Sequence, residues 1–536
     1  MLRAPRRRRA AVLPLLLLLV ACLTLSCAPG ESSGGQTPTA TPRPQASATA
    51  TANPYTTPTP PPSHSNVIAQ ENAQPGSAGW IIPSGELATT EIQAYASATS
   101  VVPGDTLTFY VSTPQAGTPY TVEVYRLGWY GGVGGRLLYS TSATGQAQGY
   151  YDYTTSALVG CASCLVDAST GLVEARWQPS LKLAIPEDWV TGVYYAKFTE
   201  KSGKQTYVQF DVRGAPNTAY LVVTSDNTYE AYNEWGGYSL YLGPNGGRGA
   251  KVSFDRPNSG PGLSQGLPYE IDAIRWMEQQ SYDVSYMSSV DLNNAGLDLL
   301  THRAIIDLGH DEYWSLQMRN NYNLARDAGL GVAFLGGNDA YWQIRYEADS
   351  QGTPDRTIVC YKLAFTDPFY GQNNALLTIT WRDPLIGHPE NALMGIMYSS
   401  WSQSIGFPWR LDAGASSPLL AGTGLVPGTS YGCDYVGYEW DRVYDNGATP
   451  PGLHVLGSSP VTNHDGMSDT SNTAYYVAPS GALVFAAGSI YWSYALDNFR
   501  LISGNNCVGQ NRAEPGMQRL MANVMEALLT PHPQGW

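Results

Sequence analysis

The chain has 536 residues, a formal net charge of −14 at pH 7 and only 14% charged residues. This negative balance argues against a phosphate-backbone ligand, so the sequence predicts no nucleic-acid partner. Tyrosine (36) and glycine (56) are abundant, which is typical of a loop-rich exported protein with β structure. A surface that binds sugars or other polar organic ligands through aromatic faces is the alternative explanation.

Residues 1–27 predict a bacterial lipoprotein signal peptide. A positive segment, residues 6–9, precedes an apolar segment, residues 10–21, that is too short for an ordinary spanning helix. Either Cys22 or Cys27 would carry the lipid. We therefore expect an exported protein, held at the outer face of the cell membrane by a lipid anchor only. An ordinary cleaved signal peptide is the alternative.

Residues 28–70 predict a disordered stalk. Up to residue 65 they contain no Val, Ile, Leu, Met, Phe or Trp, so they cannot bury enough apolar surface to fold. Residues 88–213 follow, with short alternating β-branched and aromatic runs such as residues 106–111. This pattern predicts an N-terminal β-sandwich domain, with a boundary near residues 214–217.

Residues 217–536 have a different pattern, in which compact apolar strands alternate with helical segments. The predicted strands are 219–223, 282–287, 304–308, 331–335 and 482–486, and the predicted helices are 271–280, 313–328 and one that includes 517–528. The alternation predicts a doubly wound, mostly parallel α/β domain, an arrangement that resembles the glutamine-amidotransferase fold. Residues 340–480 are less regular and predict a large insertion in that sheet.

Polar residues directly follow four of the predicted strands. The four clusters begin at Asp226, His310, Gly336 and Gly488. Because the carboxyl ends of parallel strands meet at one edge of a sheet, we expect the clusters to share one crevice. Residues 309–314 (Gly-His-Asp-Glu-Tyr-Trp) are the most informative, since they place three titratable side chains at this edge.

Within this motif, Glu312 could act as a general base, a nucleophile or a metal ligand. The alternative is structural: Asp311 or Glu312 would cap the amides at the start of the following helix. The sequence has no glycine-rich dinucleotide loop, no P-loop and no G-x-S-x-G nucleophile turn.

Five cysteines lie beyond the signal region. Cys161 and Cys164 have no second CxxC pair that would indicate a zinc site, so the spacing favours a local loop disulfide. The odd number leaves at least one free thiol among Cys360, Cys433 and Cys507 or in the pair itself.

Several long motifs resemble the large (β) subunit of N,N-dimethylformamidase over roughly residues 90–530. In chain order they are residues 228–241, 253–257, 309–314, 334–342 and 436–439. In that family a mononuclear iron, held by two tyrosines and one glutamate, hydrolyses a small tertiary amide with the help of a small partner subunit. The resemblance implies an iron-dependent amidohydrolase of non-peptide C–N bonds, with a small amide-like substrate and a partner subunit or homo-oligomer.

The resemblance also implies roles for individual residues. Tyr194, Tyr232 and Glu312 would bind ferric iron, whose preference is for hard anionic oxygen ligands. Glu439 would relay protons, and His310 or Asn338 would hold the developing oxyanion. Phe485 and Asp311 would form the substrate pocket. Because Tyr194 lies in the predicted sandwich, the site would lie at the seam between the two domains.

Two other classes of function remain as alternatives. The first is a non-catalytic lipoprotein that binds surface glycans or peptides through its aromatic residues. The second is a glycoside hydrolase that uses Glu312 and Glu439 as its carboxylate pair. The glycoside hydrolase would need an open groove between the carboxyl groups and no tyrosine hydroxyl directed at Glu312.

Overall fold

The computed structural model describes residues 66–258, 266–403, 405–499 and 513–536. The predicted signal peptide and residues 28–65 of the predicted stalk lie outside the described residues. The first helix, α1 (Val67–Asn72), falls within the last residues assigned to the stalk, and its Ile68 is buried. No helix in the described part of the chain is both long and apolar enough to cross a membrane.

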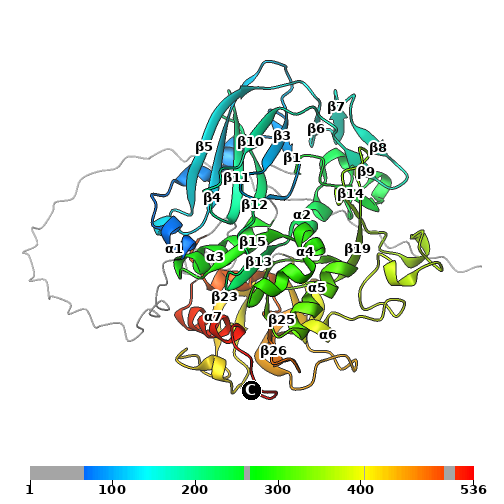
Figure 1. Ribbon diagram of the computed structural model, residues 1–536. Helices are drawn as coiled ribbons and strands as arrows, with labels where there is room; N and C mark the ends of the chain where they lie inside the picture. Colours follow the sequence, from blue (N-terminus) through cyan, green and yellow to red (C-terminus); the bar gives the residue numbers. More distant parts are fainter. Residues whose placement is uncertain (1–65, 259–265, 404, 500–512) are drawn as a thin grey trace, which may run out of the picture. The chain divides into compact units, whose positions relative to one another are not determined.

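Residues 88–213 form two main sheets, whose colours in Figure 1 run from blue through cyan to blue-green. One has the order β1 (Gln93–Ala96), β3 (Thr106–Ser112), β10 (Leu181–Ala184), and the other β2 (Ser100–Val101), β12 (Gln205–Val212), β11 (Gly192–Glu200), β4 (Pro119–Leu127), β5 (Gly135–Thr144). Both sheets are antiparallel except for the short β2–β12 pair. Alternate residues of the two sheets, such as Phe109 and Phe198, share one apolar core.

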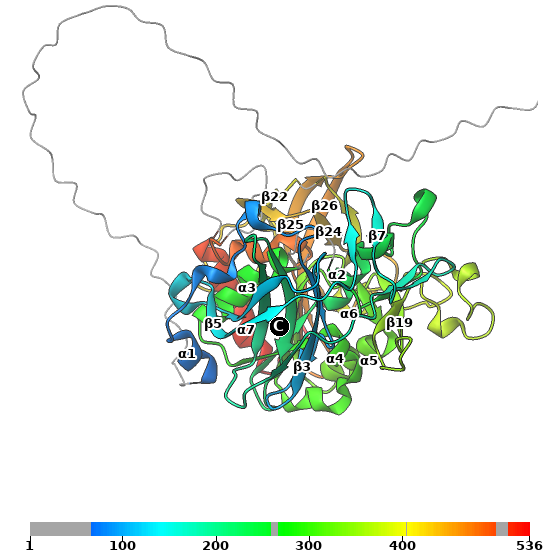
Figure 2. The same ribbon diagram turned by 90° about the horizontal axis from the view of Figure 1, so that it is seen from above.

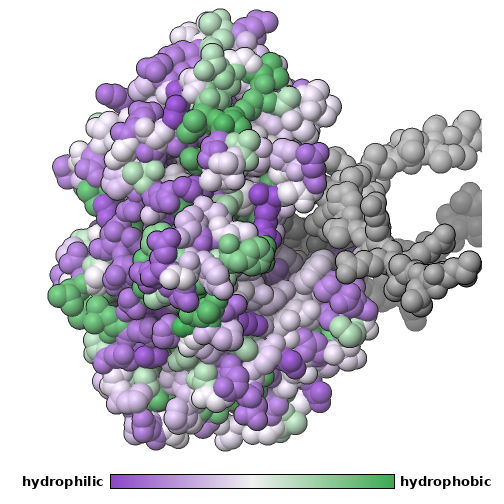
Figure 3. All heavy atoms as spheres, turned by 90° about the vertical axis from the view of Figure 1, so that its right-hand side faces the viewer, coloured by the Kyte–Doolittle hydropathy of each residue, from purple (hydrophilic) through white to green (hydrophobic). Residues whose placement is uncertain are grey.

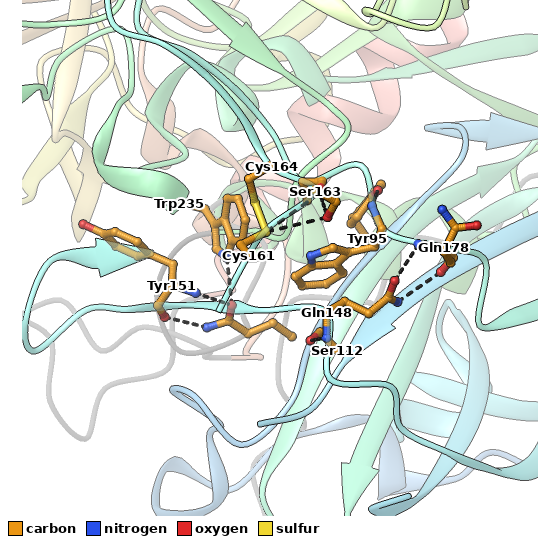
Figure 4. Close-up of a disulfide and its surroundings, with 12 residues drawn as sticks. Tyr95, Ser112, Gln148, Tyr151, Cys161, Ser163, Cys164, Gln178 and Trp235 are labelled. Carbon is orange, nitrogen blue, oxygen red and sulfur yellow. Dashed lines mark hydrogen bonds between the residues drawn. A yellow bond between two sulfur atoms is a disulfide. The ribbon is translucent and has the colours of Figure 1, made fainter. Parts of the chain in front are cut away.

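Two small hairpins extend from this β region and carry a disulfide. They are β6 (Tyr150–Asp152) with β7 (Ala157–Val159) and β8 (Leu165–Asp167) with β9 (Leu172–Glu174). Cys161 and Cys164, in the segment between the two hairpins, form the predicted local disulfide (Figure 4). Cys433 is also disulfide-bonded, and the free thiol in the described part of the chain is the buried Cys360.

A seven-stranded sheet organises the rest of the chain. Its order is β15 (Val284–Ser288), β13 (Tyr220–Thr224), β16 (Ala304–Gly309), β18 (Gly331–Gly336), β27 (Leu483–Ala486), β26 (Ser468–Val477), β25 (His454–Thr462). The first five strands are parallel, and the last two are antiparallel. The parallel strands are buried on both faces, which explains their continuous apolar sequences.

Helices cover both faces of this sheet, as Figure 2 shows from above. Side chains such as Ile306 pack with α3 (Leu267–Gln279) and α7 (Pro515–Leu528). The alternate residues, such as Ile305, pack on the other side with α4 (Ser289–Ala295), α5 (Leu316–Asp327) and α6 (Asn391–Met394). The structure therefore combines β-rich sheets with an α/β region, in agreement with the predicted class.

Smaller sheets occupy much of the predicted irregular stretch, 340–480. A four-stranded sheet has the order β14 (Lys251–Ser253), β20 (Thr357–Val359), β19 (Trp342–Glu347), β17 (Tyr313–Ser315), of which β14 and β17 come from earlier in the chain. Two further sheets have two strands each: β21 (Met397–Trp401) with β24 (Glu439–Arg442), and β22 (Phe407–Arg410) with β23 (Ser430–Val436). The strands β25 and β26 also fall in this stretch but extend the main sheet. Because residues 313–315 pair with β19, the predicted helix 313–328 begins only at Leu316.

Polar contacts join the N-terminal β region to the α/β region. Arg126 on β4 forms two hydrogen bonds of 2.7 and 2.8 Å with the carboxylate of Glu278 on α3, and both side chains are fully buried. The Tyr286 backbone N–H on β15 donates to Thr191 Oγ1 over 3.0 Å.

The surface of the protein is mixed, with apolar groups scattered among polar ones on the face shown in Figure 3.

Candidate metal centre

The carboxyl ends of adjacent parallel strands bring most of the predicted site residues together. Tyr232 ends α2 (Asp226–Tyr232), which follows β13, and residues 310–312 follow β16. Asn338 follows β18, and Glu439 comes from β24. Because β13, β16 and β18 are neighbours in the sheet, these segments meet at one edge, as predicted for parallel strands.

Two tyrosine hydroxyls converge on the carboxylate of Glu312. Tyr232 Oη donates to Glu312 Oε2 over 2.9 Å, and Tyr241 Oη lies 2.8 Å from Oε1 and 3.1 Å from Oε2. The two hydroxyls are 3.0 Å apart, and the two rings stack with their centroids 4.3 Å apart. Burial and the negative charge of Glu312 raise the pKa of both phenols well above their usual value, so both are neutral donors here.

The network continues from Tyr241 to a buried cation. Tyr313 Oη lies 2.6 Å from Tyr241 Oη and accepts a hydrogen bond of 2.7 Å from Lys362 Nζ. The same ammonium group lies 3.3 Å from the centroid of the Tyr241 ring, a cation–π contact. Lys362 is only 6% exposed, and burial lowers its pKa to about 8. A positive charge therefore lies next to the phenol that contacts Glu312.

His310 lies between the two carboxylates of the site. Its Nδ1 is 3.0 Å from the Gly337 carbonyl oxygen, which can only accept, so Nδ1 carries the proton. Burial lowers the pKa of His310, so the ring is neutral and Nε2 presents a lone pair. That Nε2 is buried without a hydrogen-bond partner, 3.5 Å from Glu312 Oε2 and 3.7 Å from Glu439 Oε2.

Glu439 is held by Asn338, whose side-chain N–H donates to Glu439 Oε2 over 2.7 Å. The backbone N–H of Asn338 donates to Asp441 Oδ1 over 2.8 Å, which fixes the residue at a φ of 55°. Burial, followed by the charge of Glu312, raises the pKa of Glu439 well above its usual value. A proton is therefore favoured on Glu439, the carboxyl group that Asn338 holds.

Asp311 lies in a different environment from its two neighbours. Its Oδ2 accepts a hydrogen bond of 2.7 Å from Trp314 Nε1, and its backbone N–H donates to Asp339 Oδ1 over 3.1 Å. The residue is fully buried. No contact in the described part of the chain joins the Asp311 side chain to Glu312 or Glu439, so Asp311 holds the turn rather than lining the predicted pocket.

The structure does not bring Tyr194 or Phe485 to this cluster. Tyr194 lies in the core of the β region, where its hydroxyl donates to the Val190 carbonyl over 2.6 Å and its ring stacks on Trp189. Phe485 lies in the middle of β27 and packs against Trp492 in the main core. Tyr241 takes the place expected for Tyr194 beside Glu312.

Capping does not explain the motif. The N-cap of α5 is Ser315, whose hydroxyl accepts a hydrogen bond of 3.0 Å from the Met318 backbone N–H. The acidic residues Asp311 and Glu312 precede β17 and make no cap hydrogen bond to this helix.

Three residues of the cluster were missed by sequence reasoning. Tyr241 and Tyr313 lie inside two of the motifs quoted above, 228–241 and 309–314, so the motifs contained a signal for them. Lys362 lies in a loop after β20 and has no comparable signal. In the described part of the chain, no three His, Cys, Asp or Glu side chains are arranged to hold a metal ion. A metal at Glu312 would therefore depend on the phenols.

Comparison with known proteins gives a family. Residues 121–510 match the family model described as N,N-dimethylformamidase beta subunit-like, C-terminal. The N,N-dimethylformamidase beta subunits of Paracoccus aminophilus and of an Alcaligenes species are 22% and 23% identical, over 68% and 60% of this chain. The alignments cover 55% and 52% of those proteins, so the chain spans about half the length of the curated relatives it matches.

Solved structures add no argument about the fold. The sporulation control protein Spo0M of Bacillus subtilis matches 24% of this chain and 51% of its own chain, at 10% identity and a TM-score of only 0.15. The family match, in contrast, covers well over half of the sequence, including every residue of the Glu312 cluster. The chain belongs to the N,N-dimethylformamidase beta subunit-like family.

Proposed function

We propose that this protein is a hydrolase of non-peptide amide C–N bonds, with a mononuclear ferric iron held by Tyr232, Tyr241 and Glu312. The observation that carries the proposal is the convergence of two phenolic hydroxyls on one buried carboxylate. Relatives named N,N-dimethylformamidase beta subunit support the amide as the bond that is broken.

The donor set fits such an ion. Oxygen ligands of a metal ion of this size lie about 2.0–2.2 Å from it, so neighbouring ligands are roughly 3 Å apart. The oxygens of Tyr232, Tyr241 and Glu312 have separations of 2.8 to 3.1 Å. Phenolate and carboxylate are hard anionic ligands that suit ferric iron. Lys362 would support the negative charge on Tyr241 once its proton has left.

Iron bound at this position would polarise an amide carbonyl and lower the pKa of a water molecule. Glu439 would first pass its proton to the Nε2 lone pair of His310, and would then take a proton from a water molecule and return it to the departing amine. Neutral His310, with its Nε2 lone pair directed between the carboxylates, is an acceptor that can share this proton. The oxyanion role expected of His310 or Asn338 thus falls to Asn338, which has a second side-chain N–H.

The wider organisation belongs to the same proposal. We infer that the two sheets of residues 88–213 form the predicted sandwich, because they share one core, and that the parallel strands form the doubly wound layer, because helices cover both faces. We also propose export as a lipoprotein from residues 1–27, and a partner subunit or homo-oligomer, since the relatives are named as subunits.

The two alternative functions are less well supported. A glycoside hydrolase needs both carboxyl groups open to a sugar, whereas two tyrosine hydroxyls contact the Glu312 carboxylate. A purely binding protein has no need of a neutral histidine held between two carboxylates beside a buried lysine.

The test is a comparison of two carboxylate variants of the full chain. Glu312→Gln should lose both the bound iron and the visible tyrosinate-to-iron absorption band. Glu439→Gln should keep the iron and the band but lose amidase activity by about 10²- to 10⁴-fold, the usual contribution of a general acid–base group. A wild-type protein that binds no iron after reconstitution would overturn the proposal, and so would a Glu312→Gln variant with a normal band.

A further inference from the structure

The motif of residues 253–257, to which the proposed function gives no role, contacts the segment between Tyr232 and Tyr241. Helix α2 ends at Tyr232, and residues 233–240, here called the return loop, bring the chain back until the two phenol rings stack. Both hydroxyls then lie within 3.1 Å of the Glu312 carboxylate. The place of Tyr241 beside Glu312 therefore depends on how the return loop is held.

Arg256, the fourth residue of this motif, holds the return loop with one guanidinium group. Its two terminal nitrogens donate to the backbone carbonyl oxygens of Asn233, Trp235 and Tyr238 over 2.8 to 2.9 Å. Its Nε donates to Glu230 Oε1 on α2 over 2.8 Å. The Arg256 side chain is fully buried, so these charge-assisted hydrogen bonds form away from competing water. One rigid group thus fixes three points of the loop relative to α2.

These contacts are specific for arginine. A guanidinium group presents five N–H donors in one rigid plane, whereas a lysine ammonium group is a single nitrogen on a flexible stem. If Arg256 served only to neutralise Glu230, one hydrogen bond would be enough. Three of the four hydrogen bonds described above go instead to carbonyl oxygens of the return loop.

A second contact carries the position of Tyr238 forward to Tyr241. Ser239, the next residue, is fully buried, and its hydroxyl oxygen accepts hydrogen bonds from the backbone N–H groups of Tyr241 and Leu242. The donor–acceptor distances are 3.1 and 2.9 Å. Because this turn is closed by a side chain within it, a shift of the Tyr238 carbonyl would move the Tyr241 phenol relative to Glu312.

The return loop has other anchors, so folding does not rest on Arg256 alone. The Asn233 side-chain N–H donates to a backbone carbonyl oxygen of the motif over 3.0 Å. Trp235, labelled in Figure 4, is fully buried, and its Nε1 donates to a glutamine of β1 over 2.8 Å. These contacts hold the first half of the loop. Arg256 extends the support to Tyr238, three residues before Tyr241.

We propose that Arg256 is a positioning residue for the Tyr232–Tyr241 pair: it holds the return loop so that both phenolic oxygens stay at ligand spacing from Glu312. This inference rests on the proposed iron site and adds to it a residue that lies outside the donor set.

Arg256→Lys tests the inference, because it keeps the positive charge beside Glu230 but removes the rigid fork. We expect iron affinity, measured by competition with a chelator, to fall about 10- to 100-fold, with a weaker tyrosinate-to-iron band. Arg126→Lys is the matched control. Arg126 is also fully buried and donates to a glutamate and to backbone carbonyl oxygens, but it joins β4 to α3. Its variant should keep wild-type iron affinity, and urea unfolding compares the stability that each variant has lost.

Hydrogen–deuterium exchange in the metal-free proteins tests the same inference without iron. The backbone N–H of Leu240 donates to the Ala231 carbonyl over 3.0 Å, so it exchanges slowly while the return loop is held. Exchange at Leu240 should be at least about tenfold faster in Arg256→Lys and unchanged in Arg126→Lys. If the wild type binds no iron but this pattern appears, the role of Arg256 in holding the loop stands and the iron assignment fails.

A second variant keeps the test decisive if Arg256→Lys does not fold. Arg256→Met combined with Glu230→Met replaces the ion pair without leaving a buried charge unpaired, and the same two results are expected. Wild-type iron affinity in a folded Arg256 variant, or wild-type exchange at Leu240, would overturn the inference. Equal losses of iron affinity in Arg256→Lys and Arg126→Lys would also overturn it, because they would reflect general destabilisation.

Discussion

The hydroxyl of Tyr241 lies 2.8 Å from Glu312 Oε1, although the two residues are 71 positions apart in the sequence. The contact depends on β16, which ends three residues before Glu312, and on the segment that follows α2, which returns Tyr241 to the same sheet edge. Tyr232 joins them from the end of α2. Three oxygen donors from two segments thus meet in one place.

Replacing one phenol tests which tyrosines belong to the site. Tyr241→Phe should reduce iron affinity by more than about 100-fold, because a lost ligand costs more than a lost neighbour of a ligand. Tyr194→Phe is the matched control: it removes one buried hydrogen bond to Val190, which costs about 1 kcal/mol of stability, and should leave the iron in place. Iron analysis and the tyrosinate absorption band give the answer, and loss of iron from Tyr194→Phe alone would restore the sequence-based assignment.

The buried Lys362 should matter for the metal through Tyr241. Lys362→Met keeps the length of the side chain but removes the charge 3.3 Å from the Tyr241 ring centroid. We expect iron affinity to fall by about 10- to 100-fold, as is typical when a group that supports a ligand is removed. Competition with an iron chelator measures the affinity. Lys251→Met is the control, because Lys251 pairs with Glu347 near the surface and should leave iron affinity unchanged.

The sequence predicts the sheet edge well because buried parallel strands produce continuous apolar runs. The strands β13, β16, β18 and β27 lie within one residue of their predicted bounds at each end, and the polar clusters after β13, β16 and β18 supply Tyr232, Glu312 and Asn338. Periodicity cannot give the pairing of Tyr313 with Trp342, which turns the start of the predicted helix into a strand. That contact is a tertiary one and has no local signal.

Tertiary contacts also decide which tyrosines lie beside Glu312. Tyr194 and Tyr195 are neighbours on β11 and face opposite sides of their sheet, so that Tyr194 packs in the β core. Tyr232 and Tyr241, nine residues apart, stack with ring centroids 4.3 Å apart because the chain turns back after α2. Sequence spacing alone cannot show such a return, and so Tyr241 and Lys362 were missed.

Gly309, the first residue of the motif 309–314, should be required for stability, both because its backbone is left-handed and because Glu270 lies close to it. Gly309 has a φ of 80°, and a Cβ at this position would lie 2.9 Å from Glu270 Cγ. Gly309→Ala should therefore cost more than the about 1–2 kcal/mol expected for a left-handed alanine. Gly203→Ala isolates that backbone cost, since Gly203 has a φ of 88° and no atom within 4 Å of its added Cβ. Urea unfolding of both variants compares them, and equal losses would show that the Glu270 contact is harmless.

The buried Glu270 should make the stability of the protein depend on pH. Its Oε1 accepts hydrogen bonds from the Ser225 backbone N–H and from the hydroxyl of Tyr229, and burial raises its pKa to about 8. The unfolded chain has a pKa near 4.3 at this residue, so the folded state binds the proton more tightly. The contribution of Glu270 to stability is therefore fully present below about pH 4 and is lost as the pH rises through about 8.

Glu270→Gln keeps the acceptor for Ser225 and Tyr229 but removes the ionisation. Its free energy of unfolding should fall less steeply than that of the wild type between pH 5 and pH 9, and the variant should gain relative stability at the alkaline end. The difference is at most about 1.4 kcal/mol for each unit by which the pKa is raised. Urea unfolding at several pH values measures both slopes. Glu86→Gln, at an exposed position, is the control; parallel curves for wild type and Glu270→Gln would show that Glu270 is already ionised in the folded protein.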